Sequence, residues 1–196
     1  MLPELPRFLA DYPEIQLHIG EGDRFVDLVR EGVDCVLRVG ELTDSAMVGR
    51  RVAMLEEATV ASPAYLARHG TPDTPDALEG HYAVSFVSSA TGAAMPFEFR
   101  DKGSIRNIAL PATISVSAAE TLLAAARLGL GLIQAPLYHL QKDIAAGRLV
   151  PILTDYAPTP TPAWLLYPHN RQLSPRVRVF IDWVARLFAS ENIAAE

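Results

Sequence analysis

The residues whose position most favours ligand binding in this chain are Ser117 and Ala118, which precede a predicted helix. Thr113–Val116 is typical of a strand, and the segment after Ser117 and Ala118 has helical spacing of apolar residues. A helix N-terminus offers backbone N–H groups that can hold an anion, and the Ser117 hydroxyl could add to them. The same hydroxyl could instead cap its own helix, and a cap can serve both purposes. The pattern predicts a site for a small anion such as a carboxylate.

Three further groups of residues lie at the ends of predicted strands, where open α/β sheets bind ligands. They are Arg38, Val39 and Gly40 after one strand, Ser62 and Pro63 after a second, and Gln134 and Pro136 after a third. An arginine such as Arg38 is more often solvated or ion-paired than a ligand clamp. Phe86 is a candidate for the floor of the same site, although a phenylalanine in a strand more often belongs to the core.

Signatures of catalysis and of metal binding are missing from the sequence. There is no G-x-S-x-G, P-loop or S-x-x-K motif. Gly129-Leu130-Gly131 lies between a helix and the following strand, the reverse of the order that phosphate binding needs. The histidines do not have the spacing of metal ligands. We therefore expect no cofactor, no metal and no catalytic residue.

Composition narrows the class of protein further. The chain has 196 residues, of which 49% are hydrophobic and 20% charged, as in a folded globular protein. Its net charge of −6 would repel phosphate backbones, so we expect no direct contact with nucleic acid. No signal peptide or apolar stretch long enough for a membrane is visible, which predicts a cytoplasmic protein without a membrane contact. The single cysteine, Cys35, has apolar neighbours and is predicted to be a buried, reduced thiol.

Strands and helices alternate along the chain, which predicts an α/β fold with largely parallel sheets. The predicted strands are 15–19, 35–39, 48–55, 58–62, 82–87, 97–100, 105–109, 113–116, 130–135, 149–153 and 164–167. The predicted helices include 23–30, 64–69, 137–146 and a C-terminal one that begins at Ser174-Pro175.

Two features predict two lobes. The strand at 58–62 can carry the chain from one lobe to the other, and the proline-rich segment 158–162 can bring it back. The expected architecture is two Rossmann-like lobes with a hinged cleft, like that of type II periplasmic binding proteins. Lobe I would comprise residues 1–61 and 163–196, and lobe II residues 62–162.

Several segments, in this order, resemble the effector-binding domain of LysR-type transcriptional regulators. They are Leu28–Gly40, Leu42–Arg51, Ala61–Gly70, Glu120–Pro136, Gly147–Leu153 and Tyr167–Trp183. The resemblance implies a small-molecule effector domain within a dimer or higher homo-oligomer, which holds DNA through a separate winged helix-turn-helix. That DNA-binding domain is absent from this chain.

The first strand of the effector domain and its following loop are also absent, which would leave a sheet edge unpaired. We expect a rearranged segment or a partner chain to fill the gap. The predicted helix Asp23–Arg30 could pack against lobe II of a neighbour, or its outward residues could be simply solvated.

The leading hypothesis is therefore a non-catalytic, effector-sensing module of a LysR-type regulator. A solute-binding protein of a transporter would share the two-lobe fold, but the sequence shows no secretion signal. A small α/β enzyme such as a dehydratase would need an acid–base pair in the cleft, and the sequence shows none.

Overall fold

The computed structural model describes residues 1–22, 28, 30–42, 47–89, 91–168 and 173–193, and it divides into two compact units. Unit 1 consists of Met1–Glu21, Val26–Met54 and Pro162–Glu196, and unit 2 of Leu55–Thr161 together with Gly22–Phe25. The predicted boundary puts residues 55–61 in lobe I. The structure places them in unit 2, because the strand formed by residues 57–61 pairs with two strands of that unit.

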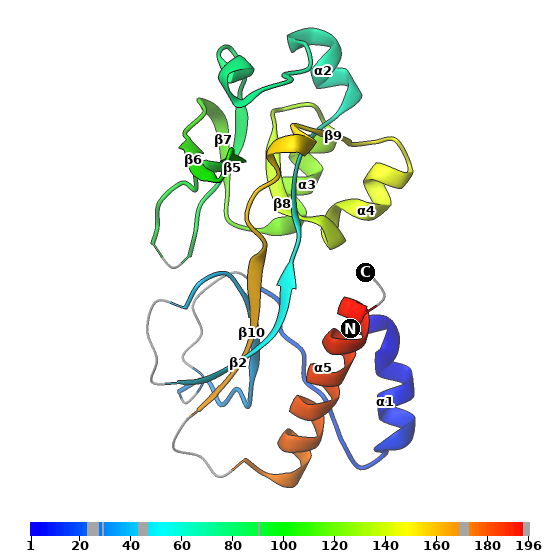
Figure 1. Cartoon of the computed structure of the whole chain (residues 1–196). Coiled ribbons are helices and arrows are strands. Elements are labelled where there is room, and N and C mark those ends of the chain that lie inside the picture. The colour runs from blue at the N-terminus through cyan, green and yellow to red at the C-terminus, as the bar shows by residue number, and fades with distance from the viewer. Residues whose placement is uncertain (23–27, 29, 43–46, 90, 169–172, 194–196) are drawn as a thin grey trace. The chain divides into compact units, whose positions relative to one another are not determined.

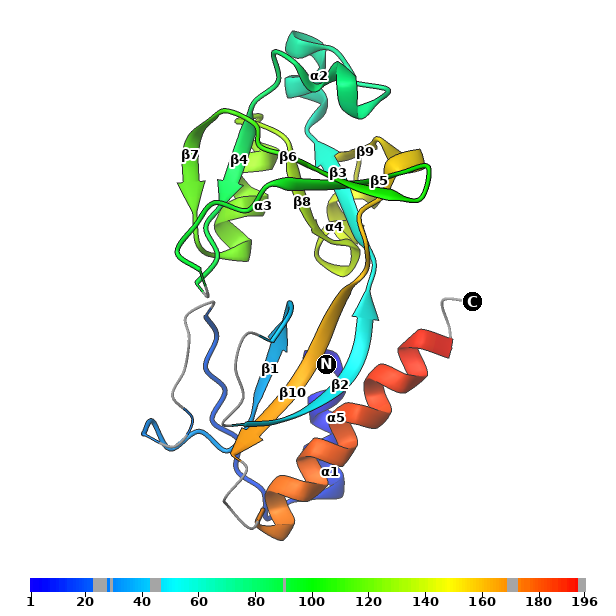
Figure 2. The ribbon, with the colours of Figure 1, turned by 60° about the vertical axis from the view of Figure 1, so that its left-hand side comes forward.

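Among the described residues, unit 1 combines one sheet with two α-helices (Figures 1 and 2). The strand order is β1-β10-β2, and β1 runs antiparallel to β10. The strands are β1 (Val36–Val39), β2 (Met47–Leu55) and β10 (Thr161–Pro168). The helices are α1 (Leu5–Asp11), which follows a 3-10 turn at Leu2–Glu4, and α5 (Pro175–Ile193).

Helices α1 and α5 lie side by side through aromatic contacts (Figure 1). The ring of Phe8, which is buried, meets those of Phe180 and Trp183 at centroid distances of 5.6 and 4.7 Å. Ser174 Oγ accepts the Val177 backbone N–H at 3.4 Å, which confirms the predicted N-cap of α5.

The strand predicted at Ile15–Ile19 is wrong. These residues belong to no strand of the described structure, although Ile15 and Leu17 are half-buried and Gln16 is exposed, as the alternating pattern indicates. A strand exists only when its backbone finds a hydrogen-bonding partner, which a pattern of side chains does not supply. Among the described strands β1 lies at a sheet edge, so the expected filling of a gap in this lobe stays a prediction. The predicted helix Asp23–Arg30 falls largely on residues outside those described.

In its described part, unit 2 contains three small sheets and three α-helices. The strands are β3 (Glu57–Ala61), β4 (Ala83–Phe86), β5 (Phe97–Asp101), β6 (Ser104–Ile108), β7 (Ala112–Val116), β8 (Ile133–Pro136) and β9 (Val150–Ile152). The helices are α2 (Pro63–His69), α3 (Ala119–Arg127) and α4 (Leu137–Ala145), with 3-10 turns at Pro75–Leu78 and Thr154–Tyr156.

The expectation of largely parallel sheets is wrong for the described strands. The pair β4–β7 is parallel, whereas β3 runs antiparallel to both β8 and β9, and β5–β6 is a hairpin. Alternating strands and helices give parallel pairs when successive strands become neighbours. Here β3 instead lies between two strands from much later in the chain.

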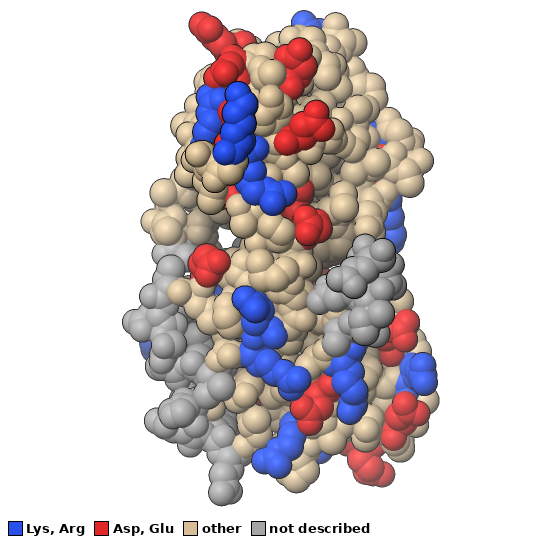
Figure 3. Space-filling view, in the orientation of Figure 1, with Lys and Arg blue, Asp and Glu red and all other residues tan. Residues whose placement is uncertain are grey.

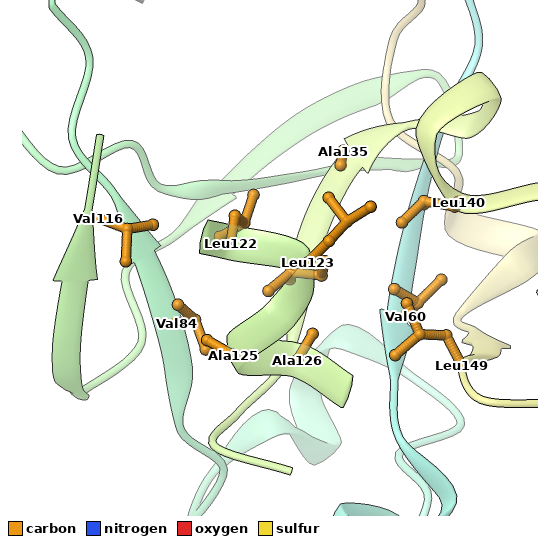
Figure 4. Packing of buried hydrophobic residues seen from close by; sticks show 11 residues of the cluster. Val60, Val84, Val116, Leu122, Leu123, Ala125, Ala126, Ala135, Leu140 and Leu149 are labelled. Atoms are coloured by element: carbon orange, nitrogen blue, oxygen red, sulfur yellow. The ribbon is translucent and has the colours of Figure 1, made fainter. Parts of the chain in front are cut away.

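The larger core of unit 2 is built on α3 (Figure 4). Leu122, Leu123 and Ala126 are nearly fully buried and pack with Val60 of β3 and Val84 of β4. Small alanine side chains on this helix allow close packing, because a bulkier residue would hold the strands away. A second cluster in the same unit surrounds Tyr65 and Phe99.

Candidate functional site

The N-terminus of α3 carries the first predicted site. The N-cap residue is Ala118, no side chain caps the helix, and Ser117 is exposed one residue earlier. The capping interpretation of Ser117 is therefore wrong, and its hydroxyl faces solvent. Glu120 lies in the first turn, where its negative charge favours the helix but opposes an added anion. The site can accept an anion only in competition with that carboxylate.

Ser62 caps a helix in the same unit. Its side chain is 2% exposed, and its Oγ accepts the Tyr65 backbone N–H at 3.2 Å as the N-cap of α2. Pro63 occupies the first turn of α2 and is exposed. A ligand at this serine would have to compete with the cap for the hydroxyl.

An aromatic cluster around the buried side chains of Tyr65 and His81, which the sequence did not predict, fixes α2 against the residues that precede β4. The Tyr65 hydroxyl accepts the Tyr82 backbone N–H at 2.8 Å and lies 3.2 Å from His81 Nδ1, and His69 stacks on the Tyr65 ring at 4.4 Å. Burial, with a smaller contribution from the charge of His69, lowers the pKa of His81 and favours its neutral form. Helical spacing places Tyr65 and His69 on one face of α2, whereas only tertiary packing brings His81 to them.

Both the oxygen and the nitrogen of the Gln134 side-chain amide form hydrogen bonds within unit 2. Its Oε1 accepts the Glu98 backbone N–H at 2.9 Å, and its Nε2 donates to the Glu98 carbonyl at 2.8 Å and to Thr59 Oγ1 at 2.9 Å. The side chain thus joins β8 to β5 in the way that a neighbouring strand would. Its predicted contact with an effector would require some of these hydrogen bonds to break.

The other predicted residues of unit 2 are largely apolar. Phe86 ends β4 and packs, partly buried, against the core around α3, in keeping with the core interpretation. Pro136 ends β8 and is half-buried. Ser62, Phe86, Ser117, Gln134 and their neighbours thus lie in one unit.

Arg38, Val39 and Gly40 lie in unit 1, at the end of β1. Arg38 is half-buried and lies opposite Trp164 of β10, and the Gly40 N–H donates to the Pro162 carbonyl at 2.9 Å. Gly40 has a φ of +111°, which a residue with a Cβ rarely adopts. The indole N–H of Trp164 is buried and has no hydrogen-bond partner in the part of the chain that the structure describes. This polar group, which sequence reasoning missed, lies opposite a predicted site residue.

Glu57 is a titratable group of unit 2 whose pKa departs strongly from its ordinary value. Burial, reinforced by the charge of Glu98, raises its pKa to about 7, while a side-chain hydrogen bond with Thr161 acts in the opposite direction. No sequence motif marks Glu57, because its burial depends on how β3 pairs. This carboxyl group can exchange its proton near neutral pH.

The remaining charged groups and Cys35 give little indication of catalysis or metal binding. Burial, and to a lesser extent Asp34, raises the pKa of the Cys35 thiol to about 11.

No group of three metal-ligating side chains is found among the described residues, and no described helix is long and apolar enough to span a membrane. On the face shown in Figure 3, described acidic and basic side chains are interspersed rather than gathered into a basic patch.

The family model and the relatives that match this chain indicate the same family of proteins. The LysR substrate binding domain family matches residues 1–189. The chain is 35% identical over 185 residues to the uncharacterized HTH-type transcriptional regulator YhjC of Escherichia coli (strain K12), covering 94% of this chain and 62% of that protein. It is 30% identical over 186 residues to the HTH-type transcriptional regulator CrgA of Neisseria meningitidis serogroup B, covering 94% and 61%. The chain therefore spans about three fifths of the length of these curated relatives.

Solved structures lead to the same family. The regulatory domain of CrgA from Neisseria meningitidis matches with a TM-score of 0.80 and 28% identity, over 95% of this chain and 91% of that one. The full-length structure of AphB, a Vibrio cholerae virulence activator, matches with a TM-score of 0.78 and 25% identity, over 96% and 63%. These similarities confirm the predicted fold class, the two-lobe α/β fold of the type II periplasmic-binding-protein kind.

Proposed function

The chain belongs to the LysR substrate-binding domain family, and we propose that it senses a small organic anion without catalysing a reaction. The observation that carries the proposal is the family match over residues 1–189, nearly the whole chain. Ligand binding would stabilise one conformation of the chain over another by its differential affinity. The relatives are named as transcriptional regulators, which favours this function over a solute-binding protein of a transporter and over an enzyme.

A carboxylate is the effector class that the described side chains support best. Unit 2 offers the N-terminus of α3, which no side chain caps, and the exposed hydroxyl of Ser117. Unit 1 offers the guanidinium group of Arg38, with the indole N–H of Trp164 opposite it in the sheet. Charged and neutral donors of this kind are suited to an anion with several acceptor atoms.

The activity of the whole protein is a further part of the proposal. We place this module in a cytoplasmic homodimer or higher oligomer that controls transcription, with DNA held by a winged helix-turn-helix outside this chain. The net charge of −6 supports a module that does not itself contact nucleic acid.

A thermal-shift titration with acetate, succinate, glutamate and benzoate tests the effector class. A compound at one hundred times its dissociation constant should stabilise the chain by about 2.7 kcal/mol, which is measurable as a rise in Tm. We expect both variants to reduce that rise, because Ser117→Ala removes a hydroxyl donor and Arg38→Gln removes the positive charge of the guanidinium group. Ser104→Ala and Arg7→Gln change exposed residues of the same types and should leave the rise unchanged.

Three results would count against the proposal. A rise in Tm that both site variants keep in full would place the ligand elsewhere. No rise with any of the four compounds would reject carboxylates as the effector class. Conversion of a compound during the titration, followed by NMR, would contradict the absence of catalysis.

A further inference from the structure

Two side chains of β5 hold the segment that leads the chain back towards unit 1. That segment ends at Thr161, the last residue of unit 2. Glu98 Oε1 accepts the Thr159 backbone N–H at 2.9 Å, and Arg100 Nε donates to the Ala157 carbonyl at 2.9 Å. Residues 157–159 are therefore attached to β5 at two points before the chain leaves the unit.

The backbone of Glu98 is held in turn by Gln134, one of the predicted effector-binding residues. Strands β5 and β6 form a sheet of their own, and β8 belongs to a different sheet. The Gln134 amide nevertheless meets both backbone polar groups of Glu98, accepting from its N–H at 2.9 Å and donating to its carbonyl at 2.8 Å. Because the amide oxygen only accepts and the amide nitrogen only donates, these two partners fix the orientation of the side chain. One side chain of β8 thus sets the position of Glu98 in β5.

The surroundings of Gln134 restrict its side chain further. Its Nε2 also donates to Thr59 Oγ1 at 2.9 Å, and Thr59 is 3% exposed and lies directly opposite Gln134 in the β3–β8 pair. The buried rings of Phe97 and Phe99 keep β5 packed in the second apolar cluster, which does not include Gln134. Loss of the amide contacts should therefore shift Glu98 without unfolding the strand.

We propose that Gln134 is a positioning residue, which fixes the Glu98 backbone and, through the Glu98 side chain, the attachment of Thr159. An effector that competes for the hydrogen bonds of the Gln134 amide would then loosen the segment around Thr159. Linkage makes the effect reciprocal, so loosening of that segment would favour the effector by the same factor. This coupling rests on the proposed function, whereas the positioning of Thr159 by Gln134 does not.

Amide hydrogen exchange of the whole chain, followed by NMR without any ligand, tests the positioning. The Thr159 amide reports directly on the hydrogen bond to Glu98. Gln134→Met keeps the length of the side chain but removes both of its hydrogen-bonding groups. We expect it to lower the protection of the Thr159 N–H several-fold, and we expect Glu98→Ala, which removes the acceptor itself, to do the same.

Two controls separate this effect from a general loss of stability. Gln141→Met changes an exposed glutamine of the same unit and should leave the protection of Thr159 unchanged. The Arg148 N–H donates to the Asp143 carbonyl at 2.9 Å, outside this network of hydrogen bonds. Its protection should therefore stay the same in Gln134→Met.

The positioning would be overturned by undiminished protection of Thr159 in Gln134→Met, or by equal losses at Thr159 and Arg148. For the coupling, whichever of acetate, succinate, glutamate and benzoate raises the Tm should also lower the protection of Thr159 in the unaltered chain. A rise in Tm with no change at Thr159 would reject the coupling but not the proposed function. No rise with any of the four compounds would reject the proposed effector class and the coupling with it, while the variants still decide the positioning.

Discussion

Asp143 in α4 shows how one residue can hold several parts of unit 2 together. Its side chain is 1% exposed and accepts hydrogen bonds from Arg127 at 2.8 Å and from Arg148 at 2.5 Å. Its backbone carbonyl also accepts the Leu149 N–H, just before β9. The hydrogen bond from Arg127 is the largest influence and lowers the pKa of Asp143, burial opposes it, and Arg148 adds to the lowering.

We predict that Asp143→Asn lowers the free energy of unfolding by about 1–3 kcal/mol near pH 7, because two charge-assisted hydrogen bonds are weakened. Both arginines are partly exposed and stay hydrated, which limits the loss. A lowered carboxyl pKa contributes stability above the ordinary value of about 3.9, and that stability disappears as the pH falls through the folded value. Urea unfolding should therefore show the two proteins converging in strong acid.

Asp73→Asn provides the matched control, since Asp73 is an exposed aspartate of the same unit. It should change the free energy of unfolding by less than about 0.5 kcal/mol at either pH. A difference between Asp143→Asn and the unaltered chain that persists unchanged in acid would mean that the ionised carboxylate is not its source.

At the scale of elements, local signals predicted most segments and tertiary partners decided the rest. Ser174-Pro175 carries its own capping chemistry, and the helix predicted to begin there is confirmed. The strands predicted at 97–100 and 105–109 are also confirmed, and they form a hairpin because Lys102-Gly103 supplies the turn. Ile15–Ile19 has the right alternation but no pairing partner among the described strands. The sequence likewise could not show that Ala118 rather than Ser117 caps α3, or that Gln134 hydrogen-bonds to β5, because both depend on the exact path of the backbone.

Gly131, just before β8, lies so close to the backbone at the start of β4 that a side chain would not fit. A Cβ at this position would lie 2.6 Å from the Ala83 carbonyl carbon and 2.8 Å from the Tyr82 oxygen, both backbone atoms. We predict that Gly131→Ala lowers the free energy of unfolding by about 1–3 kcal/mol, because β8 and β4 must move apart. Gly20→Ala, where a Cβ would meet nothing within 4 Å, is the control. Equal midpoints in chemical denaturation would show that the strands adjust without cost.

At the scale of the whole molecule, the two units differ in which parts of the sequence supply their apolar clusters. Both apolar clusters of unit 2 draw only on residues between Leu55 and Thr161. The cluster of unit 1 instead combines Leu165, Ile181 and Val184 with residues from the N-terminal part of the chain. The apolar clusters of unit 2 therefore come from one continuous stretch of the chain, whereas the cluster of unit 1 needs residues from both ends of the chain.

We predict that the fragment Leu55–Thr161 folds by itself. Its far-ultraviolet circular dichroism should show helices and strands, and urea should unfold it in one cooperative transition. The fragment Met1–Met54 should stay unfolded, because the buried residues that complete its core lie after Pro162. A gradual, non-cooperative change in the first fragment would show that unit 2 depends on unit 1.

The setting of Cys35 has a practical consequence for spectroscopy of the intact molecule. It is the single cysteine of the chain, and burial raises the pKa of its thiol to about 11, so the reactive thiolate is scarce at neutral pH. Because maleimides and similar reagents attack the thiolate, Cys35 should react very slowly. Cysteines introduced on the surface of each unit could then carry a donor and an acceptor dye in the otherwise natural sequence, and the dyes would report lobe movements as they occur.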